Sequence, residues 1–212
     1  MTLREPRRAD AAEIWALVDA CDALDLNSPY AYLLMCTDFS ETGLVARRVL
    51  DDSKSEGELM GFVLGYRPPK SPEALFIWQI GVAPAHRGRG MASRLLDVLF
   101  DRCQARSSVE RLEATVTPSN RASRTLFTRF ARERSAPIQE SVEFRSSDFP
   151  HRPSAPHRPS APHDRSEPVH PSEPSHRPEP RSSESRSTQD AETDAHEDEI
   201  RLRIGPVGPS TA

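Results

Sequence analysis

The residues with the clearest chemical potential lie in a basic, glycine-rich turn at positions 87–92, which reads Arg-Gly-Arg-Gly-Met-Ala. Gly88 and Gly90 can adopt backbone dihedrals that other residues avoid, and they let the backbone approach a ligand closely. If a helix starts directly after the turn, its unpaired N–H groups and its dipole favour a bound anion. Arg87 and Arg89 add charge-assisted donors, and the turn holds no acidic residue. The turn therefore predicts a pyrophosphate-binding site.

Two elements must hold this turn in place. The apolar stretch 75–80 (Leu-Phe-Ile-Trp-Gln-Ile) leads into it and predicts a strand. After the turn, apolar residues recur with a period close to that of a half-buried helix, whose inward-facing residues would be Ala92, Leu95, Leu96, Leu99 and Cys103. A basic turn between a strand and a helix favours a phosphate site, and the alternative is an ordinary basic connection.

Other phosphate-binding motifs fit these residues less well. A P-loop needs a Lys-Ser/Thr pair after its last glycine, where this chain has Met91 and Ala92. A dinucleotide fingerprint needs a third glycine at position 93, which is serine. The remaining pattern, Arg-x-x-Gly-x-Ala, follows a Gln-Ile-Gly-Val-Ala-Pro strand end and resembles the acetyl-CoA signature of the GNAT family of N-acetyltransferases.

Composition limits the classes of protein that fit. A net charge of -4 over 212 residues argues against a general nucleic-acid binder. Cys21, Cys36 and Cys103 are far apart and form no metal or redox pattern, so reduced thiols are expected. No apolar run is long enough to span a bilayer, and the N-terminus does not resemble a signal peptide. We therefore expect a soluble cytoplasmic protein without a metal.

The N-terminal part of the chain predicts a short strand and two helices. Residues 1–9 give at most an edge strand, and Asp10 then caps a helix in which Glu13 completes a capping box. Residues 25–29 break this helix and start the second one. The predicted inward-facing residues are Ile14, Leu17, Val18 and Cys21 in the first helix, and Tyr30, Leu33, Leu34 and Phe39 in the second.

The middle of the chain predicts mainly strands around the basic turn. Strands at 43–50 and 58–66 form a hairpin, and the central strand spans 74–82. Residues 111–117 alternate like another strand, and 118–120 read as a turn and helix cap. Another helix then follows, marked by Ala122, Leu126, Phe127 and Phe130.

Composition changes abruptly at residue 150. Residues 150–195 consist almost entirely of Pro, Ser, His, Arg and acidic residues, and such a segment cannot bury enough apolar surface to fold. Residues 196–206 then show a strand-like Ile-x-Leu-x-Ile alternation. We expect a main domain at 1–149, a disordered insertion at 150–195, a final strand of the same domain at 196–206, and a tail at 207–212. Metal binding or recognition by a proline-binding domain are alternatives for the insertion.

The predicted order of elements resembles that of GNAT enzymes. The resemblance implies an α+β fold, an α/β/α sandwich with a mixed, mainly antiparallel sheet flanked by helices. Four stretches, 25–30, 76–79, 115–123 and 196–206, closely resemble the diaminobutyrate acetyltransferases of ectoine biosynthesis. Together the resemblance covers residues 3–133 and the last strand, and the long insertion departs from it.

This resemblance implies a reaction and its partners. Acetyl would pass from acetyl-CoA, as co-substrate, to the 4-amino group of the small diamino acid L-2,4-diaminobutyrate, by direct attack in a ternary complex. Neither a nucleic acid nor a membrane takes part, and a homodimer is implied. The alternatives are another small amine or a protein N-terminus as acceptor, or an inactive fold that serves as an interaction module.

The implied acetyl-CoA site combines backbone and side chains. If the central strand splays from its neighbour near its end, the N–H groups of Ile80 and Val82 become free for the pantetheine and the thioester carbonyl. Asn120 could bind the pantetheine, cap the next helix, or do both. The complete set is Ile80, Val82, Arg87, Gly88, Arg89, Gly90, Met91, Ala92, Asn120 and Ser123.

The implied acceptor carries two ammonium groups and one carboxylate, so its site must offer acidic side chains. Asp25 could face an ammonium group or cap the second helix, and Asn27 belongs to the same motif. Trp78 could line the pocket, stack on an ammonium group or pack in the core, with Gln79 expected on the opposite face of the strand.

The candidate general bases lie on the predicted last strand. Glu197 and Glu199 are two residues apart, so their side chains would share one face, and either could act through a water molecule. A solvated acidic strand end is the alternative for each. His196 is a further candidate base, with a structural role as its alternative.

The departing thiolate needs a proton. Many relatives place a tyrosine where this chain has Phe127, which cannot donate one. Tyr30 or Tyr32 could take over, or water could supply the proton. A nucleophilic Cys36 would instead imply ping-pong kinetics, and direct transfer is preferred.

Overall fold

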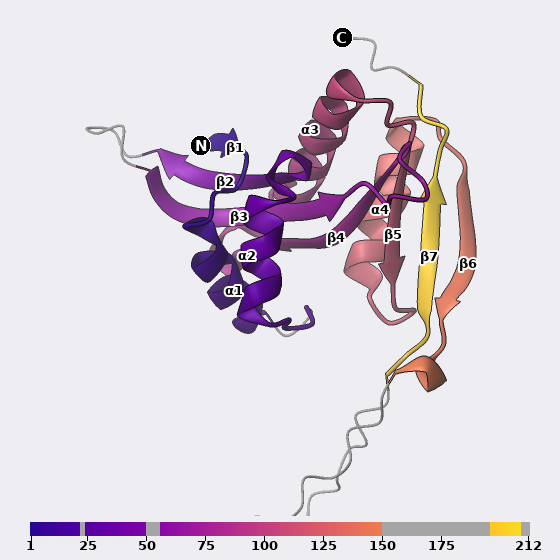
Figure 1. The fold of residues 1–212 in the computed structure, drawn as a ribbon, viewed down its shortest axis with the longest axis horizontal. Coiled ribbons are helices and arrows are strands. Elements are labelled where there is room, and N and C mark those ends of the chain that lie inside the picture. Colours follow the sequence, from indigo (N-terminus) through magenta and orange to yellow (C-terminus); the bar gives the residue numbers. More distant parts are fainter. Residues whose placement is uncertain (22–23, 50–55, 150–195, 209–212) are drawn as a thin grey trace, which may run out of the picture. The chain divides into compact units, whose positions relative to one another are not determined.

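The computed structural model describes residues 1–21, 24–49, 56–149 and 196–208, which include a seven-stranded sheet (Figure 1). The strands are β1 (Thr2–Arg4), β2 (Gly43–Val49), β3 (Glu56–Tyr66), β4 (Ala74–Val82), β5 (Arg111–Val116), β6 (Ile138–Phe144) and β7 (Glu199–Ile204). The helices are α1 (Asp10–Asp19), α2 (Pro29–Thr37), α3 (Met91–Arg106) and α4 (Arg121–Glu133). Short 3-10 helices are η1 (Ser40–Thr42), η2 (Pro84–His86) and η3 (Ser146–Asp148).

The sheet runs in the order β1-β2-β3-β4-β5-β7-β6. Every neighbouring pair is antiparallel except β4 and β5, which are parallel. The parallel pair needs a crossover, and α3 supplies it. The predicted mixed, mainly antiparallel sheet with flanking helices is confirmed.

The chain divides into two units. The larger contains Met1–Ser146 and Glu197–Ala212, and the smaller is Ser147–His196. Within the smaller unit, the rings of Phe149 and His196 stack with centroids 4.7 Å apart. The predicted insertion at 150–195 lies outside the described residues.

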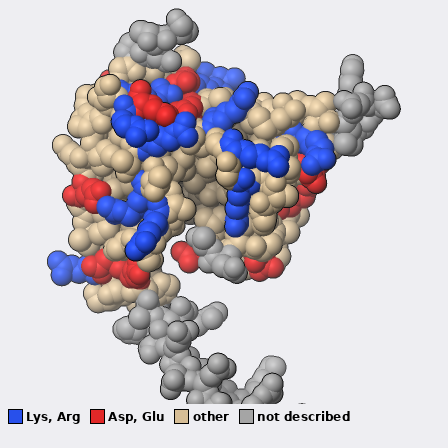
Figure 2. Space-filling model, turned by 180° about the vertical axis from the view of Figure 1, so that it is seen from behind, with Lys and Arg blue, Asp and Glu red and all other residues tan. Residues whose placement is uncertain are grey.

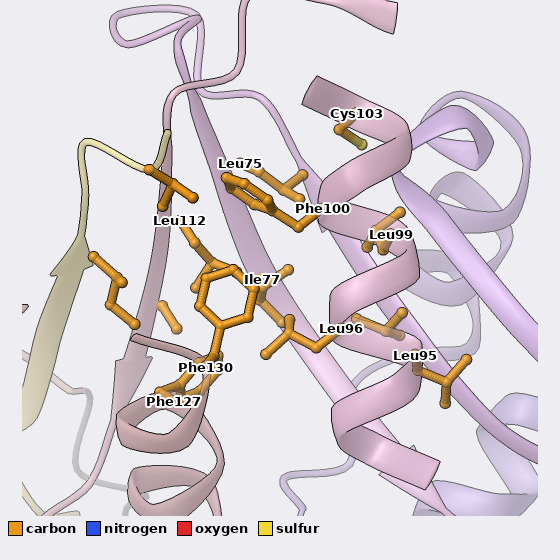
Figure 3. Close-up of a cluster of buried hydrophobic side chains, with 14 of the residues drawn as sticks. Leu75, Ile77, Leu95, Leu96, Leu99, Phe100, Cys103, Leu112, Phe127 and Phe130 are labelled. Atoms are coloured by element: carbon orange, nitrogen blue, oxygen red, sulfur yellow. The ribbon is translucent and has the colours of Figure 1, made fainter. Parts of the chain in front are cut away.

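Two hydrophobic cores lie on opposite faces of the sheet. On one face α3 and α4 pack over β4, β5 and β7, and Figure 3 shows Leu96 and Phe100 of α3 close to Phe130 of α4. On the other face α1 and α2 cover β2 and β3 through Ile14, Val18 and a buried Tyr32. This arrangement places the ends of β4 and β5 between two helical layers.

The structure adds one strand that the sequence analysis did not include. β6 pairs with β7 and forms an edge of the sheet. Its residues, Ile-Gln-Glu-Ser-Val-Glu-Phe, are mostly exposed or half-buried. A polar edge strand of this kind gives little hydrophobic alternation, which explains why it was missed.

Two predictions about the N-terminal helices are wrong. The N-cap residue of α1 is Ala9 rather than Asp10, and no side chain in the described part of the chain caps this helix. Asp10 is buried and binds Arg4 and Arg47 instead. In α2 the inward residues are Tyr32, Met35 and Cys36, whereas the predicted Tyr30, Leu33 and Phe39 are exposed.

Candidate functional site

The glycine turn (residues 87–92) has the backbone geometry that the sequence predicted. Gly88 and Gly90 have φ angles of 73° and 74°, in the left-handed region that favours glycine. A Cβ atom at either position would meet no atom of the described residues within 4 Å, so these residues leave the turn open to a ligand. Gly90 is also the N-cap residue of α3. The two glycines therefore bend an open turn directly into a helix.

The N-terminus of α3 is suited to an anion. Among the described residues no side chain caps it, and its first turn holds no acidic residue. The first intrahelical bond runs from Arg94 N–H to Gly90 O at 3.0 Å, which leaves the N–H groups of Met91, Ala92 and Ser93 without an intrahelical acceptor. These three N–H groups are the kind of donors that an anion site at a helix N-terminus requires.

The charge around this helix end is positive. Arg89, Arg94 and Arg121 are exposed and pair with no acidic side chain among the described residues, and the first turn of α4 also lacks acids. Figure 2 shows Lys and Arg side chains on both sides of a hollow on the face that carries α3 and α4. This arrangement complements a ligand with several phosphate groups.

Arg87 faces a different set of partners. Its Nε donates to Val82 O at 3.1 Å, and its Nη2 lies 2.9 Å from Cys21 Sγ, beyond the end of α1. The guanidinium therefore fastens the glycine turn to the end of β4 and to the α1 end. Its predicted role as an anion donor remains a prediction, whereas its bracing contacts are visible.

The central strands diverge beside the turn (Figure 1). β4 pairs with β5 only through Ala74–Ile77, opposite Arg111–Ala114. β4 then continues along β3 to Val82, while β5 continues along β7 to Val116. The β5-facing edge of Trp78–Val82 therefore has no strand partner in the described part of the chain.

Backbone alternation identifies the groups on this open edge. Ala83 N–H donates to Met60 O of β3 at 2.9 Å. Because successive residues of a strand point their N–H groups to opposite edges, the N–H groups of Val82 and Ile80 point away from β3. The N–H and C=O groups of one strand residue point to the same edge, and Val82 O accepts from Arg87 Nε, which agrees with this assignment. The predicted splay thus exposes the two residues that were expected to bind the cofactor through their backbone.

A β-bulge brings the acceptor-side residues together. Leu64 pairs with Gln79, but the next residue, Gly65, pairs with Ile77, so Trp78 is the extra residue on β4. Both Trp78 and Gln79 then reach Tyr32 of α2. The rings of Tyr32 and Trp78 are 5.3 Å apart, and Tyr32 OH donates to Gln79 Oε1 at 3.0 Å. The expectation that Gln79 faces the opposite side from Trp78 is wrong.

Residues 24–28, which precede α2, lie over this part of β4. Gln79 Nε2 donates to Asp25 O at 2.7 Å, and Asn27 Nδ2 donates to the same carbonyl at 3.2 Å. Ser28, not Asp25, caps α2, since its Oγ accepts from Ala31 N–H. The exposed Asp25 carboxylate therefore has no capping role. The sequence did not lead us to a role for Gln79, although a single amide side chain in an otherwise apolar strand was the sign that could have indicated one.

The two candidate tyrosines differ in environment. Tyr30, the second residue of α2, is 67% exposed. Tyr32 is fully buried, and its hydroxyl donates to Gln79 and accepts from Asn27 N–H at 3.4 Å. Phe127 is buried in the core between α4 and the sheet. Tyr30 is thus the more accessible of the two candidate proton donors.

The acidic pair near the last strand is arranged differently from the prediction. β7 begins at Glu199, so Glu197 lies before the strand and the argument that both side chains share a strand face fails. The exposed Glu197 carboxylate accepts from Ser119 N–H at 3.1 Å, in the turn between β5 and α4. Glu199 is half-buried and pairs in register with Phe144, and the neighbouring His196 is exposed.

Asn120 caps α4. Its Oδ1 accepts from Ser123 N–H at 3.0 Å, which satisfies one of the free donors at the helix start. The capping role proposed for Asn120 is confirmed, and a role toward the pantetheine remains a prediction. Ser123 is half-buried in the first turn of the same helix.

Cys36 is not suited to act as a nucleophile. It lies in the core under α2, and burial raises the pKa of its thiol to about 12. The thiol therefore stays protonated at neutral pH, which disfavours the ping-pong alternative.

Among the described residues, no group of three His, Cys, Asp or Glu side chains could hold a metal ion, and no helix has the length and apolar character to cross a membrane.

Comparisons with known proteins agree with this geometry. The acetyltransferase (GNAT) family model matches residues 13–131. The L-2,4-diaminobutyric acid acetyltransferase of Streptomyces coelicolor is 40% identical over 72% of this chain and 86% of its own length. The enzyme of the same name from Halalkalibacterium halodurans is 43% identical over 71% and 75%, respectively.

Solved structures give the same grouping. Diaminobutyrate acetyltransferase EctA from Paenibacillus lautus, in complex with its substrate L-2,4-diaminobutyric acid and coenzyme A, matches with a TM-score of 0.69 and 30% identity, covering 100% of this chain and 98% of that one. The ribosomal-protein-S18-alanine N-acetyltransferase of Escherichia coli, at 14% identity and a TM-score of 0.56, shares the fold alone. With the open β4 edge and the glycine turn, these matches show that the chain belongs to the GNAT acetyltransferase family, in the group of the L-2,4-diaminobutyric acid acetyltransferases.

Proposed function

We propose that this protein transfers acetyl from acetyl-CoA to the 4-amino group of L-2,4-diaminobutyrate, in ectoine biosynthesis. The observation that carries the proposal is the match, along almost the entire length of both chains, to the Paenibacillus lautus enzyme in complex with that diamino acid and coenzyme A. The relatives at 40% and 43% identity carry the same activity in their names.

The described residues fit acetyl-CoA. The open glycine turn and the bare N-terminus of α3 offer backbone N–H groups to the pyrophosphate, with Arg89 and Arg94 beside them. The free N–H groups of Ile80 and Val82 run along the diverged edge of β4, where an extended pantetheine can pair with them like a strand. Acetyl-CoA supplies an activated thioester, whose carbonyl these N–H groups can polarise.

The transfer itself needs few protein groups. The neutral 4-amine attacks the thioester carbonyl, a C–N bond forms and the C–S bond breaks. One proton leaves the amine nitrogen, and one proton is taken up by the departing thiolate of coenzyme A. The protein must therefore hold the amine neutral, orient it and accept its proton.

The acceptor site lies on the α2 side of the open edge. Asp25 offers an exposed carboxylate to an ammonium group of the substrate, and Asn27 adds a side-chain amide from the same segment. Trp78 is half-buried against Tyr32 and lines the site beside the open edge. The Asp25 carboxylate favours an acceptor that carries an ammonium group in addition to the attacking amine.

Glu197 and Glu199 are the candidate bases, and Tyr30 is the candidate proton donor. The Glu197 carboxylate lies at the turn that follows β5, the strand that diverges from β4 at the open edge. Its hydrogen bond from Ser119 N–H fixes the position of the carboxylate beside that turn. Tyr30 is exposed near the start of α2 and can approach the leaving group without breaking a core contact.

The proposal includes a homodimer in the cytoplasm. β6 is an edge strand, and its Val142 is 52% exposed, so a second copy can cover both the strand and this side chain. Acetyl-CoA is available in the cytoplasm, and the three cysteines are free, as expected in a reducing compartment. Light scattering during gel filtration measures the oligomeric state, and a monomer at micromolar concentration would contradict the dimer.

An acceptor panel tests the function. Release of coenzyme A is followed with L-2,4-diaminobutyrate, ornithine, lysine and a peptide amine as acceptors. The proposal predicts the highest kcat/KM for diaminobutyrate. Faster turnover of the peptide would assign the protein to N-terminal acetylation, and no turnover with intact coenzyme A binding would remove the assigned acceptor.

A further inference from the structure

Gln79 is an unusual residue for its place in the fold. It lies on β4, within the stretch Trp78–Val82 that forms the open edge, and the residue is only 9% exposed. Burying an amide is unfavourable unless both its oxygen and its nitrogen are hydrogen-bonded. Here the nitrogen bonds to Asp25, in the segment at 24–28, and the oxygen bonds to Tyr32 of α2, the helix that follows this segment.

The bonds have a fixed direction. Gln79 Nε2 donates to Asp25 O at 2.7 Å, and a carbonyl can only accept, so this bond fixes the orientation of the amide. Gln79 Oε1 therefore accepts from Tyr32 OH at 3.0 Å. The hydroxyl oxygen of Tyr32 in turn accepts from Asn27 N–H at 3.4 Å. Two backbone groups of the segment are thus tied to one side chain of β4.

Packing supports the same arrangement. A Cβ atom at Gly81 would lie 3.2 Å from Leu24 Cδ1, so the segment is in close contact with β4 next to the open edge. Trp15 Nε1 donates to Asn27 O at 3.2 Å and holds the other side of the segment. The Asp25 carboxylate accepts no hydrogen bond from the described residues and is exposed. The backbone is held, and the carboxylate is left for a ligand.

We propose that Gln79 is a positioning residue for the acceptor amine: through Asp25 O and Tyr32 it sets the distance between the Asp25 carboxylate and the open edge of β4. The inference rests on the proposed function for the identity of the amine. Gln79 does not touch the reacting atoms, so its loss lowers the affinity for the acceptor and leaves the acetyl-CoA site in place.

Three variants and a control test this role. Gln79→Met fills the space without hydrogen bonds, Gln79→Glu keeps an acceptor for Tyr32 but loses the donor to Asp25 O, and Tyr32→Phe removes the hydroxyl. Tyr66→Phe is the matched control, because this tyrosine on β3 packs against Phe39 and Phe76 rather than against the segment. KM for the acceptor, kcat, the Kd of coenzyme A and amide hydrogen exchange of residues 24–32 are measured for each.

Gln79→Met is expected to raise the acceptor KM about tenfold, as loss of a buried hydrogen bond implies. Exchange in residues 24–32 becomes faster, and the Kd of coenzyme A stays within about twofold of wild type because the glycine turn is a separate site. Gln79→Glu shows the same pattern, and Tyr66→Phe shows none of it. The Tyr32→Phe and Gln79→Met effects are less than additive, since both act through one network.

Unchanged exchange and an unchanged acceptor KM in Gln79→Met would overturn the positioning role, as would an equal loss in Tyr66→Phe. Failure of the wild-type protein to acetylate diaminobutyrate is a separate result and would overturn the proposed function. In that case the acceptor KM of each variant is measured with the amine that the panel identifies. The exchange measurement still tests the role of Gln79, because it needs no acceptor.

Discussion

Single residues in the glycine turn decide whether an anion can bind. Gly88 and Gly90 adopt left-handed φ angles in open space, so their backbone conformation, and not crowding, requires glycine. Arg87 braces the turn through Val82 O and Cys21 Sγ, while Arg89 stays exposed. These residues were recognisable in the sequence because their types, order and spacing determine the local backbone. The contact of Arg87 with Cys21 was not predictable, since it depends on how α1 packs beside β4.

Gly90→Ala tests the turn. A side chain at φ 74° costs about 1 kcal/mol, which destabilises the turn and the start of α3. We expect a higher KM for acetyl-CoA, an unchanged KM for the acceptor and a slightly lower Tm. Gly208→Ala is the control, because a Cβ there also meets no atom of the described residues within 4 Å but the φ angle is not positive. Equal acetyl-CoA kinetics in the two variants would contradict the role of the turn.

Replacing Glu197 and Glu199 separately by glutamine distinguishes the candidate bases. The variant that loses the base should lower kcat about a hundredfold and remove the acidic limb of the pH–rate profile. Glu140→Gln serves as a control, since Glu140 pairs with Arg124 on the surface. A loss of less than about threefold in both variants would assign proton removal to water or to another residue.

Whole elements were predictable where their apolar pattern is strong. β4 was predicted at 74–82 and found as Ala74–Val82, because a mostly apolar run is bounded by proline-containing turns. α2 was found, but its buried face was wrong, because Tyr30 to Cys36 are all apolar and no polar face selects an orientation. The bulge at Trp78 and the edge strand β6 depend on pairing between distant segments, which local periodicity does not record.

The attachment of α1 to the sheet depends on Asp10. Burial alone would raise the pKa of its carboxyl, but hydrogen bonds from Arg4, Arg7 N–H and Arg47 outweigh it and hold that pKa below its usual value. A lowered folded pKa means that this stabilisation is present above about pH 4, the pKa range of an unfolded aspartate, and is lost as pH falls through the folded pKa.

Asp10→Asn should therefore lower the free energy of unfolding at pH 7 by about 3 kcal/mol, because it removes the carboxylate charge that faces Arg4 and the buried Arg47. Its stability should also fall less steeply than that of wild type below pH 4. Urea denaturation between pH 3 and pH 7 measures both effects. Glu133→Gln, which breaks an exposed pair with Arg129, should cost at most about 0.5 kcal/mol, and an equal effect of the two variants would refute the buried pair.

At the scale of the whole molecule, the catalytic unit is assembled from two stretches of sequence. β7 pairs with β5 and with β6, so residues that follow position 196 complete the sheet beside the diverged strands. The sequence predicted this final strand from its Ile-x-Leu-x-Ile alternation, and we propose that residues 150–195 are an insertion between two adjacent strands. Because β6 and β7 are antiparallel neighbours, a short connection can join them.

Replacing residues 150–195 with a short Gly-Ser linker tests this organisation. We expect kcat and both KM values to remain within about twofold of wild type, and the Tm to rise slightly because a shorter loop costs less entropy to close. Loss of β7 pairing, seen as faster amide exchange in residues 199–204, would show that the insertion supports the sheet. Loss of turnover with intact exchange would place a functional group in residues 150–195.

The most direct test of the central claim is the position of the acetyl group on the product. The wild-type protein is incubated with acetyl-CoA and L-2,4-diaminobutyrate, and the product is analysed by NMR and tandem mass spectrometry. The account predicts acetylation at the 4-amino group, with one coenzyme A released per product. Acetylation at the 2-amino group, or no acetylated diamino acid while coenzyme A still binds, would contradict it.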